Sequence, residues 1–332
     1  MRKSLVMAAV AAMVLAGCSQ DDGLNSGVDQ GNGTPIEFRT VTNKTRATEM
    51  NGDNIGDFRV SAIKDATKAD FDFMLNTAVI NTGGAWGYSP KKFFPSNPVD
   101  LSFYAYSPSG SVNVASMATT AGTDEAKIVY TVPLNAKKKA QDKDPEDFLV
   151  AATQAQSGTI NMKFQHALSI ATFAAKNENT GATFIVDSIK LDNLANTGTL
   201  TAVAATPTFA WSGLGDQDQV YAASLPAAGV SVLPGKTGQL TSANEGLMIL
   251  PQAVNTSTAT SLNVYFNAVD GDFHYIFGDN HAKVIALPST FKFEMGKKYN
   301  FVFTFDDLND IKFTVEVQNW NNVDQDLTPV TP

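Results

Sequence analysis

The amino-acid sequence predicts an all-β protein of the sandwich type, on two observations. Apolar and polar residues alternate in many segments, and no stretch after residue 18 has an apolar stripe of period 3.6. Alternation with a period of two places one face of a strand against a core. Polar turn clusters such as Asn81-Thr82-Gly83-Gly84 separate these segments, and many short strands joined by such turns favour sandwiches over an α/β architecture.

The first eighteen residues have the pattern of a secretion signal. Arg2 and Lys3 precede a run of apolar and small residues from Leu5 to Gly17, which is too short to span a bilayer. The run ends in Leu15-Ala16-Gly17-Cys18, which resembles the lipobox of bacterial lipoproteins, where the cysteine thiol receives diacylglycerol. Cys18 is the only cysteine, so no disulfide framework is expected. We predict a lipoprotein signal peptide over residues 1–18, although a free cysteine beside an ordinary signal is the alternative.

Residues 19–34 are mostly Asp, Gly, Asn, Ser and Gln, and they predict a flexible tether. Asp21 and Asp22 resemble an export signal for the outer face of the outer membrane. About 290 residues remain after this tether, enough for two domains of ordinary size. The formal net charge of −9 argues against nucleic acid as a partner.

The first predicted strand follows the tether directly. Ile36, Phe38 and Thr40 alternate with more polar neighbours, so the segment can present one apolar face. A later run from Leu101 to Tyr106 alternates too, but its aromatic residues favour burial of both faces.

The C-terminal half shows the same period. Residues of one phase include Ile160, Met162 and Phe164, and the pattern recurs from Tyr299 to Phe305. The last alternating strand has Ile311, Phe313, Val315 and Val317 on its apolar face. We place the boundary just before the run that contains Ile160, which predicts an N-terminal β-sandwich over residues 35–155 and a C-terminal one over 156–332.

The sequence contains no motif that indicates a metal site or a catalytic site. The three histidines, His166, His274 and His281, lack a metal-binding spacing, and no cysteine remains after lipidation. We therefore predict no metal site, no catalytic residues and no cofactor. His166 is in phase with Phe164 and Leu168, which favours a hydrogen-bonded core histidine.

Several sequence motifs follow one another along the chain. In chain order they are Trp86-Gly87-Tyr88-Ser89-Pro90, Phe93-Phe94-Pro95, Val99 to Pro108, Asp147 to Ala151, Phe164 to Ile170, Leu247 to Gln252, Gly296-Lys297-Lys298-Tyr299 and Trp320. With these motifs the chain resembles the fimbrillin family, the type V pilins of Gram-negative anaerobes, which include the major-fimbrial-antigen-like surface lipoproteins. That resemblance implies two tandem transthyretin-like β-sandwich domains and no enzymatic activity.

The resemblance also implies a route of assembly. In the family, an arginine-specific protease cuts after an arginine behind the first strand, and a strand from a neighbouring subunit fills the groove that opens. Arg46 matches that arginine and Ala47 would be the new N-terminus, so residues 35–46 are the predicted removable segment. Arg39 is a competing site, but it lies inside the predicted strand.

The sequence offers one candidate for the donor strand. The candidate is the strand with Ile311, Phe313, Val315 and Val317, but Trp320 is expected to pack it into the second domain. The tail beyond Trp320 is mostly polar and makes a weak donor, which would suit a tip subunit better than a repeating stalk subunit. A rearrangement that frees the whole end from Ile311 onward would instead allow a stalk subunit, and the sequence does not decide between the two.

Two other functions stay open. The chain can be a lipid-retained pilus anchor, in which Arg46 has no role. It can also be a glycan-binding surface lipoprotein of a polysaccharide-uptake system, with an exposed platform formed by aromatics such as Trp86, Tyr104, Tyr106 and Trp211. The pilin hypothesis predicts a protein of the cell surface and fimbrium, with other pilus subunits, the protease and outer-membrane lipid as partners and an unidentified receptor.

Overall fold

The computed structural model describes residues 33–41, 55–65, 67, 70–134, 146–241, 246–272, 274–306, 311–320 and 329–330. These residues form strands, turns and loops without a helix, so the predicted all-β class is confirmed for this part of the chain. Accordingly, the described residues include no helix that is long and apolar enough to cross a membrane. The predicted signal peptide, most of the tether, Cys18, Arg46 and Ala47 lie outside the described residues.

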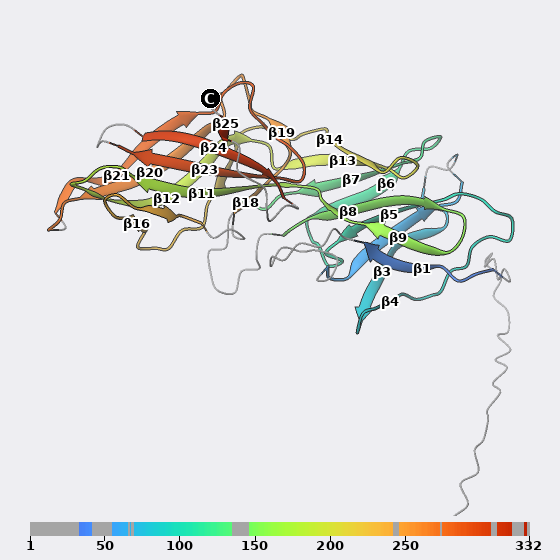
Figure 1. Cartoon of the computed structure of the whole chain (residues 1–332). Coiled ribbons are helices and arrows are strands. Elements are labelled where there is room, and N and C mark those ends of the chain that lie inside the picture. Colours follow the sequence, from blue (N-terminus) through green and yellow to red (C-terminus); the bar gives the residue numbers. More distant parts are fainter. Residues whose placement is uncertain are drawn as a thin grey trace, which may run out of the picture.

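One six-stranded sheet carries most of the N-terminal part (Figure 1), in the order β10-β8-β5-β2-β3-β4. All seven residues of its strand β5 are buried, as the aromatic residues of this segment predict. The strands are β2 (Phe58–Ile63), β3 (Met74–Thr82), β4 (Ala85–Gly87), β5 (Leu101–Ser107), β8 (Leu149–Ala155) and β10 (Gln165–His166). A separate two-stranded parallel sheet pairs β1 (Glu37–Val41) with β9 (Thr159–Lys163).

Two further sheets face one another in the C-terminal part, at the left of Figure 1. One has the order β17-β11-β23-β24-β25 with β18 on β11, and the other has the order β15-β12-β20-β21 with β16 on β12. Phe184 and Phe305 stack between them with ring centroids 4.4 Å apart. The strands are β11 (Ser169–Asn177), β12 (Thr183–Leu194), β15 (Gln219–Ala222), β16 (Val230–Val232), β17 (Thr237–Gln239), β18 (Leu247–Ile249), β20 (Ser261–Val269), β21 (Tyr275–Ala286), β23 (Lys297–Phe305), β24 (Ile311–Asn319) and β25 (Pro329–Val330).

A four-stranded sheet, β14-β13-β7-β6, joins the two parts of the molecule. Its strands are β6 (Val114–Thr119), β7 (Glu125–Thr131), β13 (Thr197–Val203) and β14 (Thr208–Ser212), and a short pair, β19 (Gln252–Ala253) with β22 (Lys292–Phe293), completes the fold. From this sheet, Tyr130 stacks on Phe148 at 4.1 Å, and the indole nitrogen of Trp211 donates to the carbonyl oxygen of Ala167 at 2.7 Å. Aromatic contacts of this kind fasten the joining sheet to both parts.

Strands on either side of residue 155 share sheets and cores. Ile160 and Met162 of β9 are buried in the N-terminal core, and β13 pairs along its whole length with β7. The division into domains at residues 155 and 156 therefore stays a prediction, and the first core also takes residues from beyond that point.

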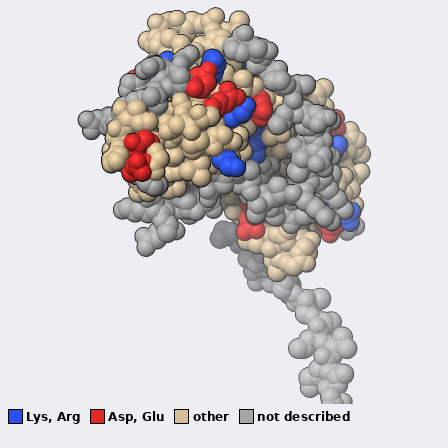
Figure 2. Space-filling model, turned by 60° about the vertical axis from the view of Figure 1, so that its left-hand side comes forward, with Lys and Arg blue, Asp and Glu red and all other residues tan. Residues whose placement is uncertain are grey.

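Charged side chains of both signs mix on the molecular surface. On the face shown in Figure 2, the described Lys and Arg side chains lie among Asp and Glu. That face carries no extended patch of a single sign over its described part.

Candidate functional site

The first strand is inserted into the N-terminal core rather than lying on it. Ile36 has no exposed surface and Phe38 is 4% exposed, whereas Glu37 and Arg39 point to solvent. The ring of Phe38 makes edge contacts with three aromatic rings: Phe58 at 6.0 Å, Tyr88 at 5.4 Å and Phe103 at 5.9 Å. Alternation of apolar and polar residues thus gives β1 one face inside the core and one outside.

Backbone hydrogen bonds hold β1 on one edge and the residues just before it on the other. On one edge, β1 pairs in parallel with β9, with Glu37 opposite Thr159 and Val41 opposite Lys163. On the other edge, the N–H of Ile36 donates to the carbonyl oxygen of Lys92 at 2.9 Å. The N–H of Phe94 donates to the carbonyl oxygen of Thr34 at 3.1 Å. We call the space that β1 occupies between β9 and residues 92–94 the first-strand groove.

Tyr88 closes one end of the first-strand groove. Its hydroxyl donates to the carbonyl oxygen of Ile36 at 3.0 Å and accepts from the N–H of Lys92 at 3.2 Å. Burial raises the pKa of the Tyr88 phenol above its ordinary value, so the hydroxyl stays a neutral donor at physiological pH. One side chain therefore ties the inserted strand to the segment that borders it.

A glycine lets the chain enter the groove. A Cβ atom on Gly33 would lie 2.3 Å from the carbonyl oxygen of Phe94. Only a residue without a Cβ fits such a close approach of two backbones. Residue 33 thus allows the pairing of Thr34 with Phe94 that starts the strand.

Burial of two large side chains contributes most of the free energy that stabilises the docking of β1. Burying Ile36 and Phe38 contributes roughly 1.5–3 kcal/mol each, and the aromatic contacts of Phe38 add roughly 0.5–1.5 kcal/mol per pair. The groove that β1 fills is therefore strongly apolar. Without β1, the backbone groups along its rims would be unpaired, and such a surface binds another strand.

The predicted residues of the removable segment divide into two groups. Ile36 and Phe38 face the core as expected, and Thr40 is half-buried. Arg39 lies opposite Asn161 within the paired part of β1. Arg46, Ala47 and Cys18 belong to stretches outside the described residues, so cleavage and lipidation remain predictions.

The candidate donor strand is fully engaged in its own sheet. β24 pairs with β23 from Ile311 to Asn319, and Ile311 and Val315 are 6% and 7% exposed. Trp320, which follows β24, is 3% exposed, and its backbone N–H donates to the carbonyl oxygen of Gly296 at 2.9 Å. The expected packing of Trp320 into the C-terminal part is confirmed.

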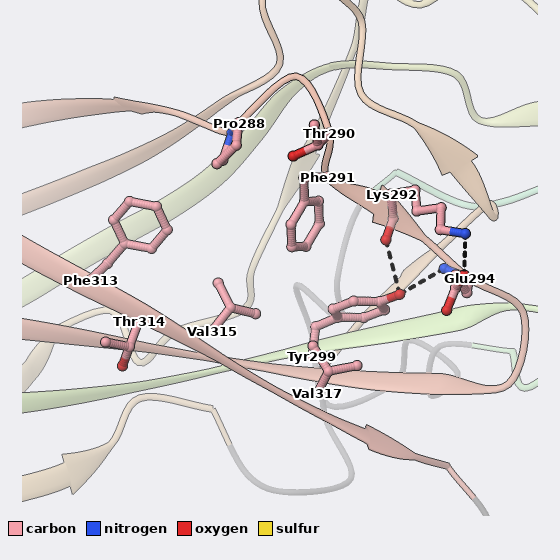
Figure 3. Close-up of a pocket in the computed structure, with 10 residues that line it drawn as sticks. All are labelled: Pro288, Thr290, Phe291, Lys292, Glu294, Tyr299, Phe313, Thr314, Val315 and Val317. Carbon is pink, nitrogen blue, oxygen red and sulfur yellow. Dashed lines mark hydrogen bonds and ion pairs between the residues drawn. The ribbon is translucent and has the colours of Figure 1, made fainter. Parts of the chain in front are cut away.

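A pocket of ≈ 340 Å³ lies on the apolar face of β24. Figure 3 shows Phe313 and Val315 of β24 facing Phe291 across it, with Lys292 and Glu294 at one side. The hydroxyl of Tyr299 accepts from the N–H of Glu294 at 2.8 Å and donates to the carbonyl oxygen of Lys292 at 3.0 Å. These polar groups hold the neighbouring turn in place, and the pocket offers apolar contact.

The residues named for other chemistry are used structurally. His166 is buried, and its Nδ1 lies 2.8 Å from the Oδ1 of Asp147, so the predicted hydrogen-bonded core histidine is confirmed. Among the described residues no three His, Cys, Asp or Glu side chains gather as metal ligands do. Tyr104 and Tyr106 are 0% and 4% exposed, which removes them from any platform for sugars.

Three parts of the groove were not predicted from the sequence. These are the parallel partner β9, the bordering residues 92–94 and the clamp formed by Tyr88. The alternation of Ile160 and Met162 signals a strand, but not which strand it joins. Tyr88 and Phe94 occur in sequence motifs, yet nothing in those motifs states their contacts.

The fold and the groove together define a class: an all-β protein whose N-terminal strand completes a core built by distant parts of the chain. The chain belongs to the fimbrillin-like family, because the model of that family matches residues 40–320.

The chain is also similar to two other proteins. Fimbrium subunit Fim1C of Phocaeicola vulgatus is 26% identical over 216 residues, which cover 57% of this chain and 56% of that protein. The match thus spans little more than half the length of this curated relative. A crystal structure of a fimbrial protein from Bacteroides vulgatus superposes with a TM-score of 0.63 over 86% of this chain and 99% of its own, at 19% identity. At that identity the likeness concerns the fold.

Proposed function

We propose that this protein is a fimbrial subunit that polymerises by exchange of its first strand. The observation that carries the proposal is the insertion of β1: Ile36 and Phe38 are buried between β9 and residues 92–94. Among the described residues β1 shares its sheet with β9 alone, and its removal would leave a template for a strand of the same pattern.

The proposal includes processing at both ends of the N-terminal region. Cys18 is lipidated during export, which brings the chain to the outer membrane and cell surface. An arginine-specific protease then cuts between Arg46 and Ala47 and releases the segment with Ile36 and Phe38. Arg39 is the poorer substrate, because a strand paired with β9 does not fit the extended cleft of a protease.

The two parts of the molecule are proposed to be tandem transthyretin-like sandwiches. The facing sheets of the C-terminal part, with Phe184 stacked on Phe305, support this for the second sandwich. In the first, the β1–β9 pair lies over the core face of the six-stranded sheet, where Phe38 meets Phe58 and Phe103.

A tip position suits this chain best. β24, the candidate donor, is paired over its whole length with β23 and anchored by buried Trp320. Freeing it would break nine residues of strand pairing and expose Ile311 and Val315. A subunit that accepts a strand but keeps its own is suited to the end of a fibre, where it would meet a host or bacterial surface.

The deciding experiment is the N-terminus and intact mass of the protein sheared from its native cell surface. A start at Ala47 in high-molecular-weight material that resists dissociation is the expected result. A start at acylated Cys18 in monomeric membrane-bound material would overturn polymerisation and leave the anchor and the glycan-binding lipoprotein.

A variant sharpens this test. Arg46→Ala is expected to fold normally and to be absent from fibres, whereas Arg39→Ala is expected to assemble like the unchanged chain. If Arg46→Ala enters fibres as well as the unchanged chain does, cleavage at Arg46 is not part of assembly.

A further inference from the structure

An open hollow of ≈ 660 Å³ lies along β3, next to the first-strand groove. Its lining includes Leu75, Ala78 and Ile80 from β3 and Tyr88 and Pro90 from the segment that follows β4. Leu75 is 63% exposed and Ile80 is 50% exposed. Two large apolar side chains thus face solvent beside a concave surface, an arrangement that marks interaction sites.

β3, the strand beneath the hollow, is paired along only part of one edge. β2 covers one edge of β3, and the N–H of Asn81 points to that side, where it donates to Oδ1 of Asp57 at 2.9 Å. On the opposite edge β4 pairs only with Ile80, Asn81 and Thr82. Among the described residues, the preceding stretch from Leu75 to Val79 has no strand partner on that edge.

This edge also lacks most of the usual protection. Exposed edges are commonly blocked by charged side chains, prolines or bulges. Residues 75–82 contain no charged residue and no proline, in a chain with 24 basic and 33 acidic residues. Only a bulge remains, near Asn76, whose φ is 45°.

The hollow and the first-strand groove share Tyr88. The ring of Tyr88 lies 5.4 Å from that of Phe38, and its hydroxyl bonds to the carbonyl oxygen of Ile36. The same side chain lines the hollow. A subunit whose strand takes the place of β1 therefore contacts Tyr88, the side chain that also lines the hollow with Leu75 and Ile80.

We propose that the open edge of β3 is a second docking surface for the neighbouring fimbrial subunit, which lays an extended, uncharged segment along Leu75–Val79 and covers Leu75 and Ile80. This inference rests on the proposed strand exchange. Backbone pairing along β3 supplies the hydrogen bonds, and the apolar hollow takes alternate side chains of the incoming segment. The junction between subunits is thus wider than the first-strand groove.

The first test places a charge on the surface. Leu75→Asp and Ile80→Asp are each expected to unfold like the unchanged chain in urea. Each is expected to lower incorporation into fibres by about tenfold or more, because an interface that buries an unpaired carboxylate is strongly disfavoured. Val112→Asp is the matched control, because Val112 is an apolar residue that is 89% exposed at another place. Incorporation of the two β3 variants at the level of Val112→Asp would overturn the inference.

A labelling experiment separates this inference from the proposed function. The chain cleaved after Arg46 contains no cysteine, so Ile80→Cys carries a single thiol for reaction with a maleimide. The full-chain monomer also carries Cys18→Ser, so that it too has one thiol. We expect rapid labelling of this monomer and protection in fibres. If fibres form and the thiol reacts in them as it does in the monomer, strand exchange stands and the second surface is wrong.

Two further outcomes are decisive. If the thiol is already protected in the monomer and becomes reactive when residues 19–32 are deleted, the chain's own tether covers the hollow and the inference is overturned. If the unchanged chain forms no fibres at all, the proposed function fails and the inference falls with it.

Discussion

The imidazole ring of His166 lies flat on the indole ring of Trp320, with ring centroids 4.0 Å apart and planes 5° apart. His166 belongs to β10 of the N-terminal sheet, and Trp320 follows β24 of the C-terminal sheet. The bond from His166 to Asp147 fixes the imidazole ring in this position. The stack therefore connects the two sheets and fixes the end of β24 in a buried position.

Trp320→Ala is expected to destabilise the protein by about 3–5 kcal/mol, the usual effect of emptying a buried aromatic site. Urea unfolding measures the change, and hydrogen exchange is expected to accelerate over β24. Trp320→Phe keeps a ring against His166 and serves as the control. Unchanged exchange in β24 of the alanine variant would show that the stack does not hold this strand.

Phe38→Ala is expected to weaken the docking of β1 by about 3–5 kcal/mol, because three aromatic contacts and a buried ring are lost. Hydrogen exchange of the β1 amides reports this directly, and the amides of β23 are expected to keep their protection. Arg39→Ala, on the solvent side of the same strand, is expected to stay within about 0.5 kcal/mol. Equal exchange rates in the two variants would contradict insertion of Phe38.

Tyr88→Phe removes only the hydroxyl that clamps Ile36 to Lys92. A buried carbonyl that loses its donor is expected to destabilise β1 by about 1–3 kcal/mol. Thermal unfolding and exchange of the Ile36 amide measure the effect. Tyr275→Phe, at a position that is 66% exposed, is the matched control. Equal results for the two variants would show that the Tyr88 hydroxyl does not stabilise β1.

The free energy of unfolding is expected to fall at high pH because the Tyr299 phenol ionises. Burial raises the pKa of this phenol to about 12, whereas the unfolded chain releases the proton near pH 10. The folded state therefore keeps a proton that the unfolded state loses, and the free energy of unfolding falls as pH rises through this window, by about 2–3 kcal/mol in all. Below pH 10 this contribution is fully present.

Tyr299→Phe has no proton to lose at this position, so its stability is expected to decline less steeply between pH 10 and 12. Other buried tyrosines keep their share in both chains, because burial also raises the pKa values of Tyr104 and Tyr221. Urea titrations at several pH values measure the two slopes. Parallel slopes would contradict the buried state of the Tyr299 hydroxyl.

Local pattern predicted local structure well. Alternation identified β1, β23 and β24, and the aromatic residues of Leu101–Tyr106 predicted a strand buried on both faces. Such patterns report which side chains face a core, since burial acts on each residue separately. The same reasoning predicted a buried, hydrogen-bonded His166, though not its partner Asp147.

Sequence patterns did not predict which strands pair when the two strands are far apart in the sequence. Two pairings illustrate this: β1 with β9 in parallel, and β7 with β13 antiparallel across the predicted boundary. Both depend on backbone groups that every residue carries. For the same reason, the hydrogen bonds of residues 92–94 to Thr34 and Ile36 leave no trace in hydrophobic periodicity. The groove was expected from family resemblance, and its walls became visible only in three dimensions.

β1 finds its parallel partner about 120 residues further along the chain, and closing so long a loop is entropically unfavourable and slow. Its neighbours in the N-terminal half include local hairpins, such as β2 with β3, that form without it. We therefore expect β1 to dock after these hairpins have formed. Any strand held nearby at high local concentration before β1 docks would compete with it for the same place.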